Sequence, residues 1–122
     1  MTRYLISFGA HAMDHIPGED MPAVAKAAHA VVQEAVNAGV FVCAGGLEDQ
    51  RASIVAADGT VTDGPYAEAK EVVAGYQMIE VDSMERAIEI AARVSAVPGP
   101  GGVPIQQPIE IRQVMDDPPI DL

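Results

Sequence analysis

The chain has few of the residues that mark several common classes of protein. Its single cysteine, Cys43, excludes an intramolecular disulfide and any zinc site built on several cysteines. Only 7 lysine and arginine residues stand against 18 aspartate and glutamate residues, so the formal net charge is −11. This balance argues against nonspecific binding to nucleic acid or to an anionic membrane, because both require a basic patch.

The sequence also lacks long apolar runs and recognisable cofactor motifs. No apolar stretch reaches the ~20 residues that a bilayer-spanning helix needs, and residues 1–4 do not resemble the start of a signal peptide. Residues 44–47 are glycine-rich, but the lysine that a phosphate-binding P-loop requires does not follow them. We therefore expect a cytoplasmic protein that binds no membrane, nucleic acid or cofactor.

What the sequence does contain is enough apolar material for one domain. Hydrophobic residues make up 49% of the 122 residues, and this length is usual for a single domain. We expect the domain to span residues 1–115. Residues 116–122 are acidic and proline-rich, which predicts a frayed tail.

Hydrophobic periodicity and turn residues predict two helices and six strands. The first helix is expected to begin after an N-cap at Asp20 and to end at Gly39, and the second to follow an N-cap at Asp82. The apolar face of the second helix is predicted to consist of Met84, Ala87, Ile88, Ala91 and Val94. Strands are expected at 3–8, 40–43, 53–57, 60–62, 72–81 and 109–115.

The order of these elements predicts the fold class. It reads β-α-β, then a hairpin around Asp58-Gly59, then β-α-β, which favours a ferredoxin-like α+β sandwich with both helices on one sheet face. The strand at 72–81 carries apolar residues on both of its faces, so the sheet needs a second cover. Since only two helices are available, we expect a homodimer that packs sheet against sheet, with a pocket near the interface.

Two residues are the main candidates for acid–base chemistry. His29 lies at the border of the apolar face of the first helix, where a ring can point into a cleft and exchange a proton near neutral pH. Asp63 stands in an Asp-Gly-Pro-Tyr turn, from which a carboxylate can orient an imidazole or take a proton itself. Both also have structural interpretations, as a boundary histidine bonded to a backbone carbonyl and as an aspartate that stabilises its own turn.

The few cations and the other histidines are further candidates. Arg112 and Lys70 can bind a substrate carboxylate or phosphate, or they can form salt bridges with the many carboxylates of this chain. His11 and His15 have a spacing that suits a metal ion on a helix, but Pro17 and nearby glycines disfavour a helix there. We therefore expect no metal site.

The motif at residues 63–71 carries a resemblance to a known family. Its sequence, Asp-Gly-Pro-Tyr-Ala-Glu-Ala-Lys-Glu, followed by Gly75-Tyr76, resembles the DGPF (DGPFAETKE) branch of the YCII-related family. The opening strand, the Ala-His-Ala triplet at 28–30 and the closing strand fit the same pattern, so the resemblance covers nearly the whole chain. Tyr66 replaces the usual phenylalanine and Ala69 the usual threonine.

The resemblance implies a fold, an assembly and a catalytic pair. Members of the family are expected to adopt a ferredoxin-like fold that dimerises into an α+β barrel. Carried over to this sequence, the helix histidine and the motif aspartate of the catalytic pair are His29 and Asp63. Some members are associated with extracytoplasmic-function sigma factors, which suggests a possible partner but no substrate.

Three hypotheses about function remain open at this point. In the first, a small cofactor-independent enzyme uses His29, oriented by Asp63, in a lyase, elimination or isomerisation reaction, and Tyr66, Arg112 and Lys70 bind the substrate. In the second, the same residues contact a small ligand in a binding or regulatory dimer without catalysis. In the third, the dimer is structural and has no small-molecule site.

Overall fold

The computed structural model describes residues 1–47, 52–65 and 72–116. The helices and strands follow one another in the predicted order, and two short 3-10 helices lie in the connections before the first α-helix and after the second. In chain order the elements are β1 (Thr2–Gly9), η1 (Gly18–Asp20), α1 (Met21–Asn37), β2 (Phe41–Gly46), β3 (Ala52–Val55), β4 (Val61–Gly64), β5 (Val73–Val81), α2 (Met84–Ser95), η2 (Pro100–Gly102) and β6 (Glu110–Gln113).

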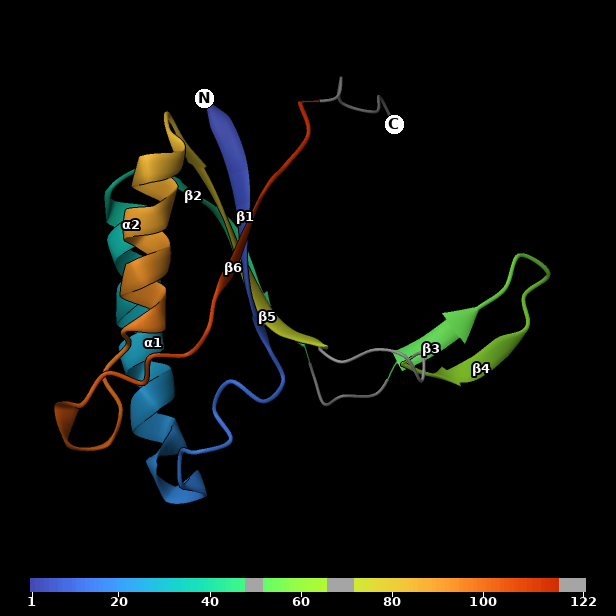
Figure 1. The fold of residues 1–122 in the computed structure, drawn as a ribbon, viewed down its shortest axis with the longest axis horizontal. Coiled ribbons are helices and arrows are strands. Elements are labelled where there is room, and N and C mark those ends of the chain that lie inside the picture. The colour runs from blue at the N-terminus through green and yellow to red at the C-terminus, as the bar shows by residue number, and fades with distance from the viewer. Residues whose placement is uncertain (48–51, 66–71, 117–122) are drawn as a thin grey trace.

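Four of the strands form one antiparallel sheet in the spatial order β2-β5-β1-β6. β1, α1 and β2 form the split β-α-β unit of ferredoxin-like folds, because β5 lies between β1 and β2 in the sheet. Figure 1 shows both helices on the same face of the sheet. The predicted ferredoxin-like α+β fold is therefore confirmed. We call this part of the molecule the body. It consists of β1, α1, β2, β5, α2 and β6.

The core of the body lies between the sheet and the helices, because side chains alternate between the two faces of each strand. One buried cluster joins β1, β5 and α2 and consists of Tyr4, Ile6, Ile79, Val81, Ala87, Ile90 and Ala91. A second joins α1 to the segments on either side of η2 and consists of Val24, Val31, Val97 and Ile105. Within residues 1–47, 52–65 and 72–116, no helix covers the opposite face of the sheet.

Two details of α2 differ from the prediction. Its N-cap is Ser83 and not Asp82, because Ser83 is the last extended residue and its Oγ accepts a hydrogen bond from the Arg86 N–H at 3.2 Å. Ile88 is 53% exposed, whereas Ile90 is buried. The buried face therefore follows residues 87, 90 and 91, at the i, i+3, i+4 spacing of one side of a helix.

Close packing of the Phe8 ring explains why a glycine, Gly75, stands in the middle of the longest strand, β5. A Cβ atom at this position would lie 2.3 Å from Cζ of Phe8, whose ring packs over the strand at this point. The pairing register between β1 and β5 also shifts here, between Phe8 and Gly9. The register shift and the close packing of the Phe8 ring therefore both occur at this glycine.

The strands β3 and β4 form a separate two-stranded sheet, which we call the arm (residues 52–64). As predicted, the arm turns at Asp58-Gly59, where Gly59 has a φ of 89° and Asp58 Oδ1 accepts a hydrogen bond from Thr60 N at 2.9 Å. Asp63 is part of β4 and lies opposite Ser53, so the prediction that it is a turn residue is wrong. The reason is that strand pairing continues as far as Gly64.

The ends of two other strands differ from the predicted ones. β2 continues through Gly45 and Gly46, because β5 pairs with both. β6 ends at Gln113, earlier than expected. In the described part of the chain, no helix is both long enough and apolar enough to cross a membrane. The tail predicted at 116–122 lies outside the described residues except for its first residue.

Candidate functional site

A cleft of about 310 Å³ lies between α1 and the sheet of the body, and we call it the His29 cleft. α1 contributes His29, and β2 contributes the small residues 44–46, whose short side chains leave space open. The lining also includes Phe8 from β1, Gln77 from β5 and Gln107 from the segment before β6. A mainly apolar concavity with a few polar groups is the usual form of a small-molecule site.

His29 occupies the position that the helical periodicity predicted. Val24 and Val31 of α1 are buried in the core, and His29 lies at the border of the apolar face that they define. Its side chain is exposed and lines the cleft. It therefore combines access to solvent with access to the cleft, which a proton-transfer group requires.

Two buried glutamines also line the cleft, and neither was predicted from the sequence. Gln77 is 5% exposed on the helix-facing side of β5, and Gln107 is 3% exposed. A signal was available for Gln77, because it is polar in the otherwise apolar series of buried positions 75, 77, 79 and 81. Gln107 has no comparable signal, since it belongs to a loop whose course depends on contacts with α2.

Asp63 does not line the His29 cleft of its own chain. Its side chain is exposed on β4. Figure 1 shows that the arm extends from the body on the side of the sheet away from the helices. A single chain therefore does not bring His29 and Asp63 together, and their pairing stays a prediction.

Of the predicted substrate-binding residues, only Arg112 belongs to the described part of the chain. Arg112 is exposed on β6, and it lies opposite Leu5 on the sheet face that the helices do not cover. It is therefore separate from the His29 cleft. Tyr66 and Lys70 lie outside the described residues, so the structure does not place them.

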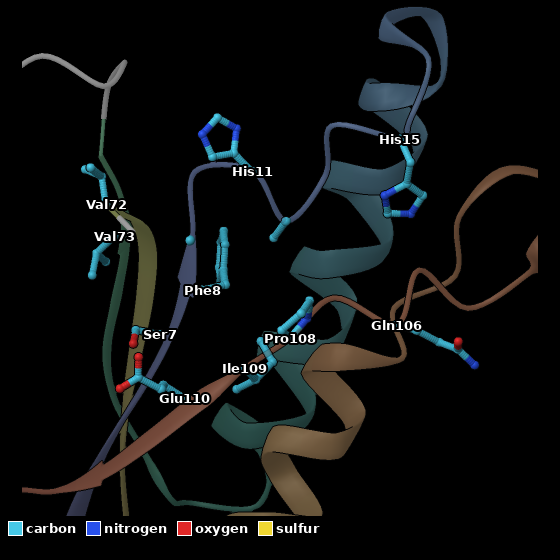
Figure 2. Close-up of a pocket in the computed structure, with 12 residues that line it drawn as sticks. Ser7, Phe8, His11, His15, Val72, Val73, Gln106, Pro108, Ile109 and Glu110 are labelled. Carbon is cyan, nitrogen blue, oxygen red and sulfur yellow. The ribbon is translucent and has the colours of Figure 1, made fainter. Parts of the chain in front are cut away.

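A second, larger hollow of about 540 Å³ is lined by His11 and His15 (Figure 2). His11 Nδ1 lies 2.7 Å from Asp14 Oδ2, and both side chains are mostly exposed. Figure 2 shows Glu110 beside Ser7, away from both histidines. Among the described residues, no group of three or more His, Cys, Asp or Glu side chains is placed to hold a metal ion.

Charged residues on the outer side of the helices form an ion pair that joins α1 to α2. The Arg93 guanidinium donates to both carboxylate oxygens of Glu34, at 2.6 and 3.2 Å. These hydrogen bonds lower the pKa of the Glu34 carboxyl and raise the pKa of Arg93. Both side chains are more than half exposed, so the pair links the helices but contributes little to stability.

Comparison with known proteins adds a family to this geometry. A model of the YCII-related domain matches residues 11–105, which include α1 with His29 and the arm with Asp63. In the comparison with curated proteins, no match was found. The resemblance of residues 63–71 to the DGPF branch is a finer assignment than this match makes. Because the matched span covers most of the chain, the protein belongs to the YCII-related family.

Proposed function

We propose that this protein is a small enzyme in which His29 transfers a proton on a small organic substrate held in the His29 cleft. The setting of His29 carries the proposal. Among the described residues that line the cleft, it has the one side chain that ordinarily titrates near neutral pH. The other lining side chains are apolar or carry uncharged polar groups.

This arrangement suits a lyase, elimination or isomerisation reaction, in which a proton is removed from one atom and returned to another. A positioned acid–base group typically contributes ~10²–10⁴-fold to such a rate. The apolar walls support the role, because interactions between charges strengthen when a bound substrate displaces water from such walls. The proposed reaction relies on acid–base chemistry alone and needs no cofactor.

In this proposal Asp63 comes from a second copy of the chain. A two-stranded hairpin is only marginally stable by itself in water, and the arm leaves Val55 65% and Val61 59% exposed. We propose a homodimer in which the arm of one chain packs on the other and brings Asp63 to the partner's His29. The carboxylate then orients the imidazole and stabilises its protonated form.

The uncovered face of the body's sheet supports the same assembly. β1 and β5 pair Leu5 with Met78 and Ser7 with Tyr76 on this face, where the larger side chains are only partly buried. Packing two such faces together would remove apolar surface from water, which is the main driving force for association. In that dimer Arg112 lies at the interface, while Tyr66 and Lys70 stay candidates on the chemistry of their side chains, because they lie outside the described residues.

A second candidate function is a small-ligand-binding or regulatory module without catalysis. The observation that favours it is the position of Asp63, which lies outside the cleft of its own chain. In this alternative, His29 is a ligand contact, and binding of the ligand is sensed by another protein. The cleft and the dimer are the same in both proposals, so only turnover distinguishes them.

The test compares His29→Asn with His11→Asn in a screen of small organic compounds. We expect His29→Asn to lower kcat about 10²–10⁴-fold with little change in KM, because the acid–base group is lost while the cleft remains. His11→Asn is the matched control, since His11 lines the other hollow and its loss leaves the cleft intact. Equal activity of the two variants would contradict the proposal.

The binding alternative predicts a different outcome of the same screen. A compound that raises the melting temperature but is not turned over would favour the binding module, because a ligand of the native state stabilises it. Light scattering tests the assembly separately. We expect twice the chain mass of 12.8 kDa, and a monomer at micromolar concentration would exclude a site that needs two chains.

A further inference from the structure

The two glutamines of the His29 cleft each carry a buried polar atom without a partner. Nε2 of Gln77 and Oε1 of Gln107 are fully covered, and neither makes a hydrogen bond to any described residue. Buried polar groups are nearly always hydrogen-bonded, because an unpaired one has lost its contacts with water and gained nothing in return. Two such atoms beside one cleft, one a donor and one an acceptor, indicate a missing partner.

Gln107 is held in one orientation by its surroundings. Its Nε2 donates to the Val94 carbonyl at 3.2 Å, and its backbone N–H donates to the Ser95 carbonyl at 3.3 Å. Ser95 Oγ donates to the Gln107 carbonyl at 2.6 Å. Since the amide nitrogen is already committed to the end of α2, the unpaired atom of this side chain is the acceptor Oε1.

The backbone before Gln107 supports the same orientation. Gln106 has a φ of 57°, in the left-handed region that residues other than glycine rarely adopt. Strained positions of this kind persist where the surrounding contacts require them, and they often lie beside binding sites. Here the strained residue positions a buried amide that also closes the C-terminal end of α2.

Gln77 has no comparable structural role among the described residues. It lies on the helix-facing side of β5, opposite Ile6 of β1, where an apolar side chain would complete the core. The described lining of the cleft contains no carboxylate, ammonium or guanidinium group. Among the described lining residues, only His29, when protonated, can balance a charge on a ligand, whereas an uncharged polar group finds both a donor and an acceptor in the two amides.

We infer that the His29 cleft recognises a small uncharged molecule that carries a carbonyl oxygen and a neighbouring N–H or O–H on an apolar frame, as carboxamides and hydroxyketones do. The side chains that cover the two amide atoms shift slightly to admit the ligand, and Gln77 Nε2 then donates to its carbonyl oxygen while Gln107 Oε1 accepts from its N–H or O–H. The volume of about 310 Å³ lies at the lower end of the range for ligand pockets. This inference rests on the proposed site and names its substrate class, but it does not depend on the role of His29.

Three probes with one frame test the inference: cyclopentanecarboxamide, cyclopentyl methyl ketone and cyclopentanecarboxylate. Binding is followed by NMR through the side-chain amide signals of Gln77 and Gln107. We expect the carboxamide to bind about tenfold more tightly than the ketone, which lacks the donor, and than the charged carboxylate. The signals of both amides should shift with the carboxamide.

Three variants assign the contacts. Gln77→Met should weaken carboxamide binding about tenfold, and Gln107→Met should remove the preference for the carboxamide over the ketone. Gln33→Met is the matched control, because Gln33 is an exposed glutamine of α1 that bonds Asn37 outside the cleft. Melting curves establish that each variant is folded, and Gln77→Leu replaces Gln77→Met if the latter is not.

The inference is wrong if the three probes bind equally, if none binds, or if Gln77→Met binds like the wild type. A buried water would then satisfy the two amides. His29→Asn separates this outcome from a failure of the proposed function. If that variant keeps both full turnover and the carboxamide preference, the recognition stands and the proton-transfer role fails.

Discussion

The body and the arm of this protein differ in whether they can bury their own apolar residues. In the body, two helices cover one face of a four-stranded sheet, and Ile79 is completely buried. In the arm, two strands pair only with each other, and Val55 and Val61 remain largely exposed. The body also contains the His29 cleft, whereas the arm carries Asp63. The two residues of the proposed catalytic pair thus lie on different parts of the molecule, and a single chain does not bring them close together.

The body can therefore be a stable fold without containing both residues of the proposed catalytic pair. The body has the sheet, the helices and the buried clusters that a single domain requires. The arm has two strands and no further layer among the described residues, and a hairpin of this kind is only marginally stable by itself.

Truncation of an apolar side chain should be costly in the body and cheap in the arm. We expect Ile79→Ala to lower the free energy of unfolding by about 2–5 kcal/mol, because it leaves a cavity in the core. Val61→Ala, at a 59% exposed position, should change it by less than about 0.5 kcal/mol at concentrations where the chain is monomeric. Urea unfolding measures both. A similar cost for both variants would mean that the arm is packed as tightly as the body.

The close approach at Gly75 offers a sharper test of packing within the body. Gly75→Ala should cost about 1–3 kcal/mol, because its new Cβ would overlap the Phe8 ring. Gly18→Ala is the control, since nothing lies within 4 Å of a Cβ at that position.

The same contact predicts non-additivity. In a Phe8→Leu background the ring is gone, so Gly75→Ala should cost less than it does alone. The measurement is a double-mutant cycle of unfolding free energies in urea. Additive costs would show that the Phe8 ring is not what excludes a side chain from position 75.

The smallest expected effect concerns the Glu34–Arg93 ion pair between the helices. Since Arg93 lowers the pKa of the folded Glu34 carboxyl below its ordinary value of 4.5, the unfolded chain binds this proton more readily. The stabilisation is therefore fully present above pH 4.5 and is lost as the pH falls through the lowered folded pKa. It should be small, because the pair is exposed.

Glu34→Gln tests this pH dependence. Its urea midpoint should be slightly below that of the wild type at pH 7 and should converge with it in acid. Glu19→Gln removes one carboxylate from η1 and serves as the control for net charge. A gap between Glu34→Gln and the wild type that widens in acid would contradict the assigned direction.

Local sequence signals were sufficient for the fold. The mostly apolar run along β5, the Asp58-Gly59 turn and the apolar face of α1 each specify an element from neighbouring residues, and their order specifies the sandwich. The same periodicity placed His29 at the edge of the helix face. Where an adjacent residue could serve equally well, as for Asp82 and Ser83, the sequence did not decide the helix boundary.

The rest of the site depends on contacts between distant parts of the chain. Gln107 is buried because its loop bonds the C-terminal end of α2, and no sequence pattern around residue 107 predicts that contact. Asp63 is part of a motif that the sequence makes conspicuous, but the position of the arm depends on what it packs against. Pairing of Asp63 with His29 is therefore a question of assembly, which neither local periodicity nor a single chain answers.

A crystal structure of the assembled protein tests the central claim most directly, because it locates Asp63 relative to each His29 cleft. We predict a dimer in which the Asp63 carboxylate reaches the partner's His29, either at a hydrogen-bond distance of about 2.6–3.2 Å or through one water molecule. A dimer in which each Asp63 points into solvent, away from both clefts, would contradict the account.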